Sequence, residues 1–492
     1  MKKHFLPAAV LLVVLSIPAW TQSVCPLNGT SSGKLSCLIP QVYGPLGIGS
    51  GQGAPLLANG HEAHFENDFI TTFTPINEAI GIQAAQLPLA SPSSGLTFTF
   101  DPTLKTFTPS EEGSLGPILG ERADTIGRHK LYLAFSYQYF NFNSIDGQDT
   151  SNLNVVFQHV PFTPNAFAGP CPNQSGLPAK YANNPCFVRD FIQTTTNVDL
   201  TESQYAFYAT YGLSSKLDFS VAVPFLNVNM NVRSQATIVS NSVAPPIANF
   251  PNGNFHQFNP ATVPSCSGTP AGQSCLTGQF SDSGSASGIG DVVFRGKYEA
   301  YKGEHLGFAL GVDVRTPTGD ETNYLGSGAY GVKPFGVLSY RARVSPHLEV
   351  GYEVNGDSLL AGDFVGTTTN TKGSLPDRFI YIAGADAGIT KRLSASFDII
   401  GSRFIGAPQV SASTFTDLGR CSNIACTTLT PGTTHPDLAV NPNTDYNATS
   451  ASIGLKFRPV GNFIVTGNVL VQLDDGGLRS RVVPLVGVSY SF

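Results

Sequence analysis

The sequence predicts an all-β protein, a transmembrane antiparallel up-and-down β-barrel of about twelve strands, with fourteen as the alternative. Three observations support this. Charged residues make up 13% of the 492 residues, about half the usual share. From residue 129 to the end, segments of ten to sixteen residues alternate apolar and polar side chains, the period of a strand with two different faces. The connections between them are mostly short and long in turn, as in outer-membrane barrels.

Composition excludes several other classes of protein. The 28 basic and 34 acidic residues give a net charge of −6, so no basic surface for nucleic acid is expected. Beyond the first twenty residues no apolar run reaches the length of a membrane-spanning helix. The 33 Phe and 17 Tyr residues argue against disorder. A soluble β-sandwich also alternates, but its strands are shorter and its turns do not alternate in length.

Residues 1–21 are predicted to be a signal peptide for export to the bacterial outer membrane. Lys2 and Lys3 precede an apolar run, and small residues follow it. Residues 22–128 are rich in Gly, Pro, Ser and Thr. We expect an irregular N-terminal segment with a short helix at 76–87 and a hairpin at 96–108, which forms either a plug in the lumen or a periplasmic extension. Residues 129–492 form the predicted barrel.

Eight cysteines fall into four close pairs. In an exported protein with no C-x-x-C motif, this spacing predicts four local disulfides. The pairs are Cys25 and Cys37, Cys171 and Cys186, Cys266 and Cys275, and Cys421 and Cys426.

Each predicted strand has one apolar face. In the first, Leu133, Phe135 and Tyr137 lie opposite Ser136 and Gln138. In the third, the apolar phase slips by one residue after Pro224, which predicts a β-bulge. The strands are expected at 131–139, 204–213, 217–232, 291–300, 306–315, 330–340, 348–354, 378–386, 393–399, 452–457, 463–472 and 482–492.

The predicted connections place short turns on one rim and long loops on the other. Short turns are expected at 214–215, 302–304, 341–346, 390–392 and 459–461. Long loops are expected at 143–197, 233–289, 316–329, 357–376 and 403–446, with only 474–477 short among them. Because lipid offers no hydrogen bonds, such a sheet must close on itself and point its apolar faces outward.

The opposite faces then line the lumen. The predicted lumen cations are Arg295, Lys297, Arg315, Lys333, Arg378 and Lys456. The predicted lumen anions are Asp291, Glu299, Asp313, Glu349, Glu353, Asp386 and Asp398. A lumen with one dominant sign would select ions. Balanced signs predict pairs across the lumen and a narrow or gated path, unless the pairs only rigidify the barrel.

Six segments together resemble one family. They are 288–293, 311–321, 326–334, 352–358, 375–377 and 484–492. Over roughly 125–492 the chain resembles the outer-membrane transporter family named for the meta-pathway of phenol degradation. It is distantly similar to outer-membrane channels for fatty acids and aromatic hydrocarbons. The resemblance implies a barrel with a transport role, and the terminal Phe492 resembles the signal read by the barrel-assembly machinery.

The sequence therefore predicts a channel for passive uptake of small hydrophobic or aromatic solutes. The alternative is a structural or adhesive barrel whose external loops are the functional part. Expected partners are outer-membrane lipid, lipopolysaccharide, the barrel-assembly machinery and the solute. No enzyme activity, cofactor or metal site is expected: the G-x-G-x-x-G at 326–331 precedes a strand instead of joining a strand to a helix. The oligomeric state stays open.

Overall fold

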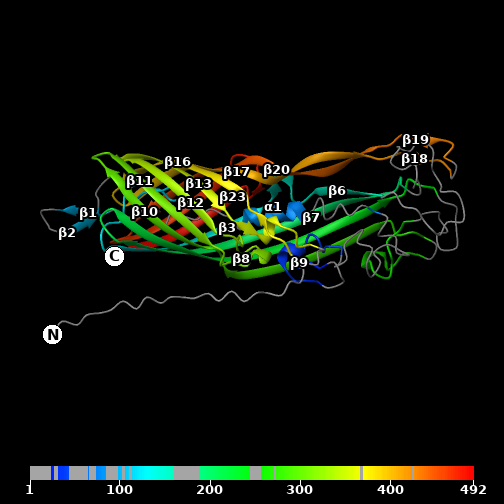
Figure 1. The fold of residues 1–492 in the computed structure, drawn as a ribbon, viewed down its shortest axis with the longest axis horizontal. Coiled ribbons are helices and arrows are strands. Elements are labelled where there is room, and N and C mark those ends of the chain that lie inside the picture. The colour runs from blue at the N-terminus through cyan, green and yellow to red at the C-terminus, as the bar shows by residue number, and fades with distance from the viewer. Residues whose placement is uncertain are drawn as a thin grey trace, which may run out of the picture.

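The computed structural model describes residues 24–26, 31–43, 65, 74–84, 98–101, 106–109, 114–159, 188–243, 256–270, 273–365, 370–423 and 426–492. Their main feature is a closed barrel of twelve antiparallel strands with two further strands attached (Figure 1). β3 closes the barrel by pairing with β23 on one side and β7 on the other, with Phe135 opposite Val488 and Phe207. The predicted all-β barrel is thus confirmed, with twelve strands.

The barrel strands differ in length. Four of them have 22–24 residues, and the other eight have 10–14. The twelve are β3 (Leu131–Phe142), β7 (Phe191–Gly212), β8 (Leu217–Val239), β10 (Val292–Lys302), β11 (Leu306–Thr316), β12 (Gly331–Tyr340), β13 (Val344–Asn355), β16 (Asp377–Thr390), β17 (Leu393–Thr416), β20 (Thr434–Phe457), β21 (Phe463–Gln472) and β23 (Val482–Ser491).

The two rims of the barrel are unlike. Connections of two to five residues, together with Phe492, lie at one rim, which we call the turn end. The long connections lie at the other, the loop end. Here the predicted loops at 143–197, 233–289 and 403–446 are partly wrong, because β7, β8, β17 and β20 run on past the short strands. β6 (Leu153–Gln158) pairs with β7, and β9 (Thr277–Ile289) pairs with β8, so the wall continues beyond the barrel.

The predicted bulge after Pro224 is also wrong. β8 pairs with β7 from Asp218 to Val239 without a register shift, and buried residues alternate with more exposed ones throughout. The surroundings of the two faces of β8 change along the strand, and its register does not. Up to Phe225 the apolar side chains point outward, whereas from Leu226 they point inward and Asn229 points outward. We infer that β8 leaves the lipid at this level, where water replaces lipid outside and an apolar interior replaces a polar one.

Below that level the outer surface is apolar. Large hydrophobic side chains such as Phe207, Leu310, Phe397 and Ile453 are 48–58% exposed. A soluble protein would bury them, but lipid makes this exposure favourable. None of the helices among the described residues is long and apolar enough to span a membrane.

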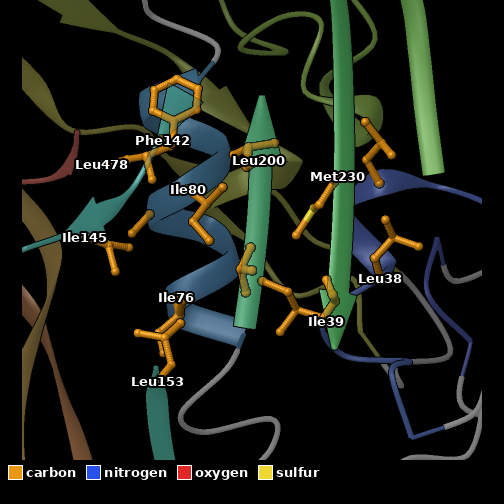
Figure 2. Close-up of a cluster of buried hydrophobic side chains, with 14 of the residues drawn as sticks. Leu38, Ile39, Ile76, Ile80, Phe142, Ile145, Leu153, Leu200, Met230 and Leu478 are labelled. Carbon is orange, nitrogen blue, oxygen red and sulfur yellow. The ribbon is translucent and has the colours of Figure 1, made fainter. Parts of the chain in front are cut away.

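Parts of the N-terminal segment lie at both ends of the barrel. Helix α1 (Thr74–Ala84) contacts β17, β20 and β22 (Leu478–Arg479) near the loop end, and the hairpin of β1 (Phe98–Asp101) and β2 (Thr106–Pro109) lies at the turn end (Figure 1). Ile76 and Ile80 of α1 pack against wall residues such as Phe142 and Leu200 (Figure 2). The predicted helix and hairpin are both present.

Short elements and disulfides organise the loop end. Three predicted disulfides form, Cys25–Cys37, Cys266–Cys275 and Cys421–Cys426. Cys171 and Cys186 lie outside the described residues. The short strands are β4 (Ser144–Ile145), β5 (Gln148–Asp149), β14 (Asp357–Ser358), β15 (Gly373–Ser374), β18 (Arg420–Cys421) and β19 (Leu429–Thr430). The 3-10 helices are η1 (Leu35–Cys37), η5 (Pro264–Cys266), η6 (Glu321–Asn323) and η7 (Leu359–Ala361).

Candidate functional site: the lumen of the barrel

Twelve of the thirteen predicted lumen residues lie on barrel strands with their side chains on the interior side, and Asp291 lies just before β10. Eleven of the thirteen are buried, and Lys333 and Arg378 each leave 13% of the side chain exposed. Alternation places them there, since successive side chains of a strand point to opposite faces. A buried charge without a partner is costly, so these charges must find partners.

One group of partners lies on β11, β13 and β16, together with Asp291 just before β10. Arg315 donates to Asp291 (3.1 Å) and to Glu353 (3.1 Å), and Arg378 donates to the second oxygen of Glu353. The pairs join strands that are one or two apart, not opposite walls. The expected pairs across the lumen are therefore not what the wall residues form, because twelve strands hold opposite walls too far apart.

A second group adjoins the first. Arg295 donates two parallel hydrogen bonds, of 2.6 and 2.7 Å, to the two carboxylate oxygens of Asp313. This bidentate geometry makes Arg–carboxylate pairs strong. Lys333 bridges Asp313 (3.0 Å) and Glu349 (3.4 Å). The ring of Phe335 lies 4.8 Å from the Arg295 guanidinium and 5.1 Å from the Lys333 ammonium, which adds cation–π contacts.

The partners that sequence reasoning missed come from residues 114–128, which we call the crossing segment. Its Glu121 is 1% exposed and pairs with Arg295 and with Lys297 (3.1 Å). Arg122 pairs with Asp386, and Asp124 pairs with Arg341 of the β12–β13 turn (2.6 Å). Hydrogen bonds to Arg341 hold the pKa of Asp124 below its usual value although burial acts in the opposite direction. The sequence did contain a signal for these partners, because three charged residues lie within the four positions 121–124 of a segment that is otherwise poor in charge.

Backbone groups fasten the crossing segment on further sides. The amides of Leu115, Ala123 and Ile126 donate to Ser394, Ser339 and Asp218 at 2.8–3.2 Å, and the Lys456 ammonium donates to the carbonyl of Pro117 (2.5 Å). These contacts reach β8, β10, β12, β16, β17 and β20, so the segment runs across the lumen near the turn end. His347 adds a wall contact beside it, at 2.7 Å from Asp398.

A cavity of about 270 Å³ lies above the crossing segment. One part of its lining is the ion-paired layer just described, including Arg295, Arg315 and Lys333. The remainder is largely apolar or neutral, with Leu119 below and Phe140, Phe142 and Ile400 on the wall. We call it the central cavity. Pockets with such a mixed lining are typical of ligand sites.

On its loop-end side the cavity adjoins the buried apolar cluster in which α1 packs against the wall (Figure 2). Its members include Ile39, Ile76, Ile80, Leu153, Leu200 and Met230. Glu78 is the acidic residue of α1. Burial, and secondarily the charge of Asp363, raises its pKa to about 7. The seating of the helix is thus coupled to a proton near neutral pH.

Metal-binding and nucleotide-binding sites have characteristic residue patterns, with which the described residues can be compared. Across the described residues, no group of three or more His, Cys, Asp and Glu side chains is arranged to hold a metal ion. The loop at 326–331 uses Ser327 to contact Asp291 and Arg315, so its glycines serve packing near β10 and β11, as expected for a loop.

Solved structures with some likeness to the chain include outer-membrane proteins. An outer membrane channel from Pseudomonas putida F1 is 10% identical over 76% of this chain and 99% of its own, with a TM-score of 0.41. A FadL homologue from Pseudomonas aeruginosa is 10% identical over 81% and 94%, with a TM-score of 0.27. The toluene transporter TbuX of Ralstonia pickettii is 11% identical over 74% and 90%, with a TM-score of 0.25.

The comparison by sequence is more direct. A search of curated proteins gives no match. Residues 184–384, which run from β7 into β16, match the family model described as "Putative MetA-pathway of phenol degradation". The match covers the wall strands that carry most of the ion-paired layer, and it confirms over these residues the family resemblance seen in the sequence.

Proposed function

We propose that this protein is an outer-membrane channel for passive uptake of small hydrophobic or aromatic solutes. The observation that carries the proposal is the central cavity, a space of about 270 Å³ with apolar and polar lining in the lumen of a lipid-facing barrel. The match to the phenol-degradation family supports the same class of solute. Residues 1–21 would direct export as a cleaved signal, the turn end would face the periplasm, and Phe492 would guide assembly.

The lumen charges favour an uncharged solute. Arg315 and Lys333 already have carboxylate partners. A charged solute would have to separate one of these buried pairs and leave a buried charge behind, which is costly. An uncharged aromatic ring with one hydrogen-bonding group fits the mixed lining of the central cavity without that cost. The thirteen lumen residues would thus act as a filter on charge.

The resting state would be closed. The crossing segment occupies the lumen below the central cavity, and α1 occupies it above. We therefore expect residues 22–128 to serve as a plug that rearranges when a solute passes, rather than as a separate periplasmic extension.

Two measurements test the proposal together. Cells that lack the protein should take up radiolabelled phenol or toluene more slowly at low concentration than cells that express it, and the folded, oxidised protein in a planar bilayer should be mostly closed. Equal uptake in the two strains would refute the transport function. That result, together with altered surface adhesion, would favour the structural or adhesive barrel with functional external loops.

A further inference from the structure

We propose that solute leaves the central cavity toward the turn end along the inner faces of β3, β7 and β23, with Tyr208 as the gate. This inference rests on the proposed transport function and adds a route and a gating residue to it. The alternative route runs through the ion-paired layer on β10 to β16. The two routes predict different residues as the barrier.

Tyr208 separates two cavities. It lines the central cavity together with Gln204 and Ser220. It also lines a second cavity of about 30 Å³, nearer the turn end, with Ile118 and Gly487. A space of this size holds about one water molecule, so the second cavity passes a solute only when a side chain moves. The side chain of Tyr208, which is 3% exposed, is the partition.

The neighbours of Tyr208 are small. On the inner wall its register partners are Ala134 on β3 and Ala222 on β8, and Ala206 precedes it on the same face of β7. Beyond Ala134, the inner face of β23 carries Gly487 and Ser489 at this level. At its own level Tyr208 is therefore the large side chain among small wall residues, whereas Tyr132 and Leu485 line the second cavity from neighbouring positions. Displacement of Tyr208 would join the two cavities without moving the wall.

The crossing segment is held mainly on the other side. Its ion pairs through Glu121, Arg122 and Asp124 reach β10, β16 and the β12–β13 turn. Toward β3 and β23 it presents Ile118, whose side chain faces the second cavity. Apolar contacts yield more easily than buried ion pairs, which leave uncompensated charges when they part. The crossing segment can therefore stay fastened while solute passes beside Ile118.

The contacts of the route fit an uncharged solute. The Tyr208 hydroxyl lies 3.3 Å from the Ser136 hydroxyl, a neutral hydrogen bond that costs little to open. The charged group on this path is Lys456, and its ammonium donates to the carbonyls of Pro117 and Leu115 at 2.5 and 3.4 Å. A hydroxyl-bearing aromatic solute could exchange hydrogen bonds with Gln204 and Ser136 in turn.

The experiment measures the open probability of the barrel in a planar bilayer with KCl on both sides. It compares two variants in which a buried aromatic side chain is replaced by alanine. Tyr208→Ala should raise the open probability about tenfold or more, a shift of the kind expected when one barrier side chain is removed. Tyr208→Phe keeps the ring and should stay closed. Phe335→Ala, the matched buried aromatic of the ion-paired layer, should have little effect. Opening by Phe335→Ala with no response to Tyr208→Ala would overturn the route.

Folding and function are controlled separately. Heat-modifiable migration in a gel reports whether each variant forms its barrel. If Tyr208→Ala does not fold, Ile118→Ala tests the same partition from the crossing segment, and no response to it would refute the gate. Equal phenol uptake by cells with and without the protein would refute transport itself, whereas an open Tyr208→Ala barrel in that case would still support the route.

Discussion

Glu121→Gln should release the crossing segment from the wall. Glu121 is 1% exposed and bridges Arg295 and Lys297. The substitution keeps the shape of the side chain and removes its charge, so two buried cations lose a shared carboxylate. We expect the seated state of the segment to become less stable without loss of the barrel, whose strands pair independently of this residue.

The size of this destabilisation depends on the hydrogen bonds that Arg295 and Lys297 keep in the Glu121→Gln variant. Arg295 keeps its two hydrogen bonds to Asp313, at 2.6 and 2.7 Å, and Lys297 keeps the carbonyl of Arg122 at 2.9 Å. Breaking a buried ion pair generally costs about 3–5 kcal/mol, and these remaining contacts place the effect near the lower limit, about 3 kcal/mol. At 1.36 kcal/mol per tenfold change, the ratio of seated to released segment should fall roughly 150-fold.

Hydrogen exchange of residues 114–126 measures this directly, and bilayer conductance measures its consequence. Glu304→Gln is the matched control, because the Glu304 side chain is 89% exposed in the turn after β10. The control should exchange like wild type. Unchanged protection of the crossing segment in Glu121→Gln would refute the reasoning, because the buried carboxylate would then contribute nothing to holding the segment.

Three further predictions concern other parts of the chain. The raised pKa of Glu78, about 7, means that its contribution to seating α1 is complete below about pH 4 and is lost as pH rises through 7. The protection of α1 amides relative to their intrinsic exchange rates at each pH should therefore fall between pH 5 and 8, and Glu78→Gln should abolish that fall. Replacing both Cys25 and Cys37 by Ser should weaken the loop-end anchor by about 3 kcal/mol in the chain-entropy model, seen as faster proteolysis near residue 31. On the outer face of β7, Phe207→Arg should cost about 2–4 kcal/mol of barrel stability in urea, whereas Thr201→Arg, above the inferred lipid boundary, should cost close to nothing; equal costs would place that boundary elsewhere.

The barrel was predictable because lipid imposes one rule on every strand. Alternation identifies the two faces of a strand, and the short turns fix which strands are neighbours. The same alternation predicts the thirteen lumen charges, and eleven of these side chains are buried in the structure.

The wrong bulge prediction and the missed contacts of Glu121 concern residues that do not face lipid. After Pro224 the apolar residues of β8 move to the inner face, and a sequence pattern alone does not distinguish a change of register from a change of surroundings. The Glu121 contacts were out of reach for another reason, because the crossing segment has no period and its partner Arg295 lies 174 residues away. Contacts of that separation depend on closure of the whole barrel.

The described parts of the N-terminal segment make contacts at both rims. Cys25 hydrogen-bonds Phe364 beyond β13 near the loop end, while the crossing segment leads into β3 at the turn end, and β3 is joined edge to edge with the final strand β23. The described N-terminal residues are therefore attached to the wall at both rims, and the wall itself closes where β3 meets β23. A plug attached at one rim only could leave the lumen as a unit. Attachment at both rims favours a local rearrangement inside the lumen instead.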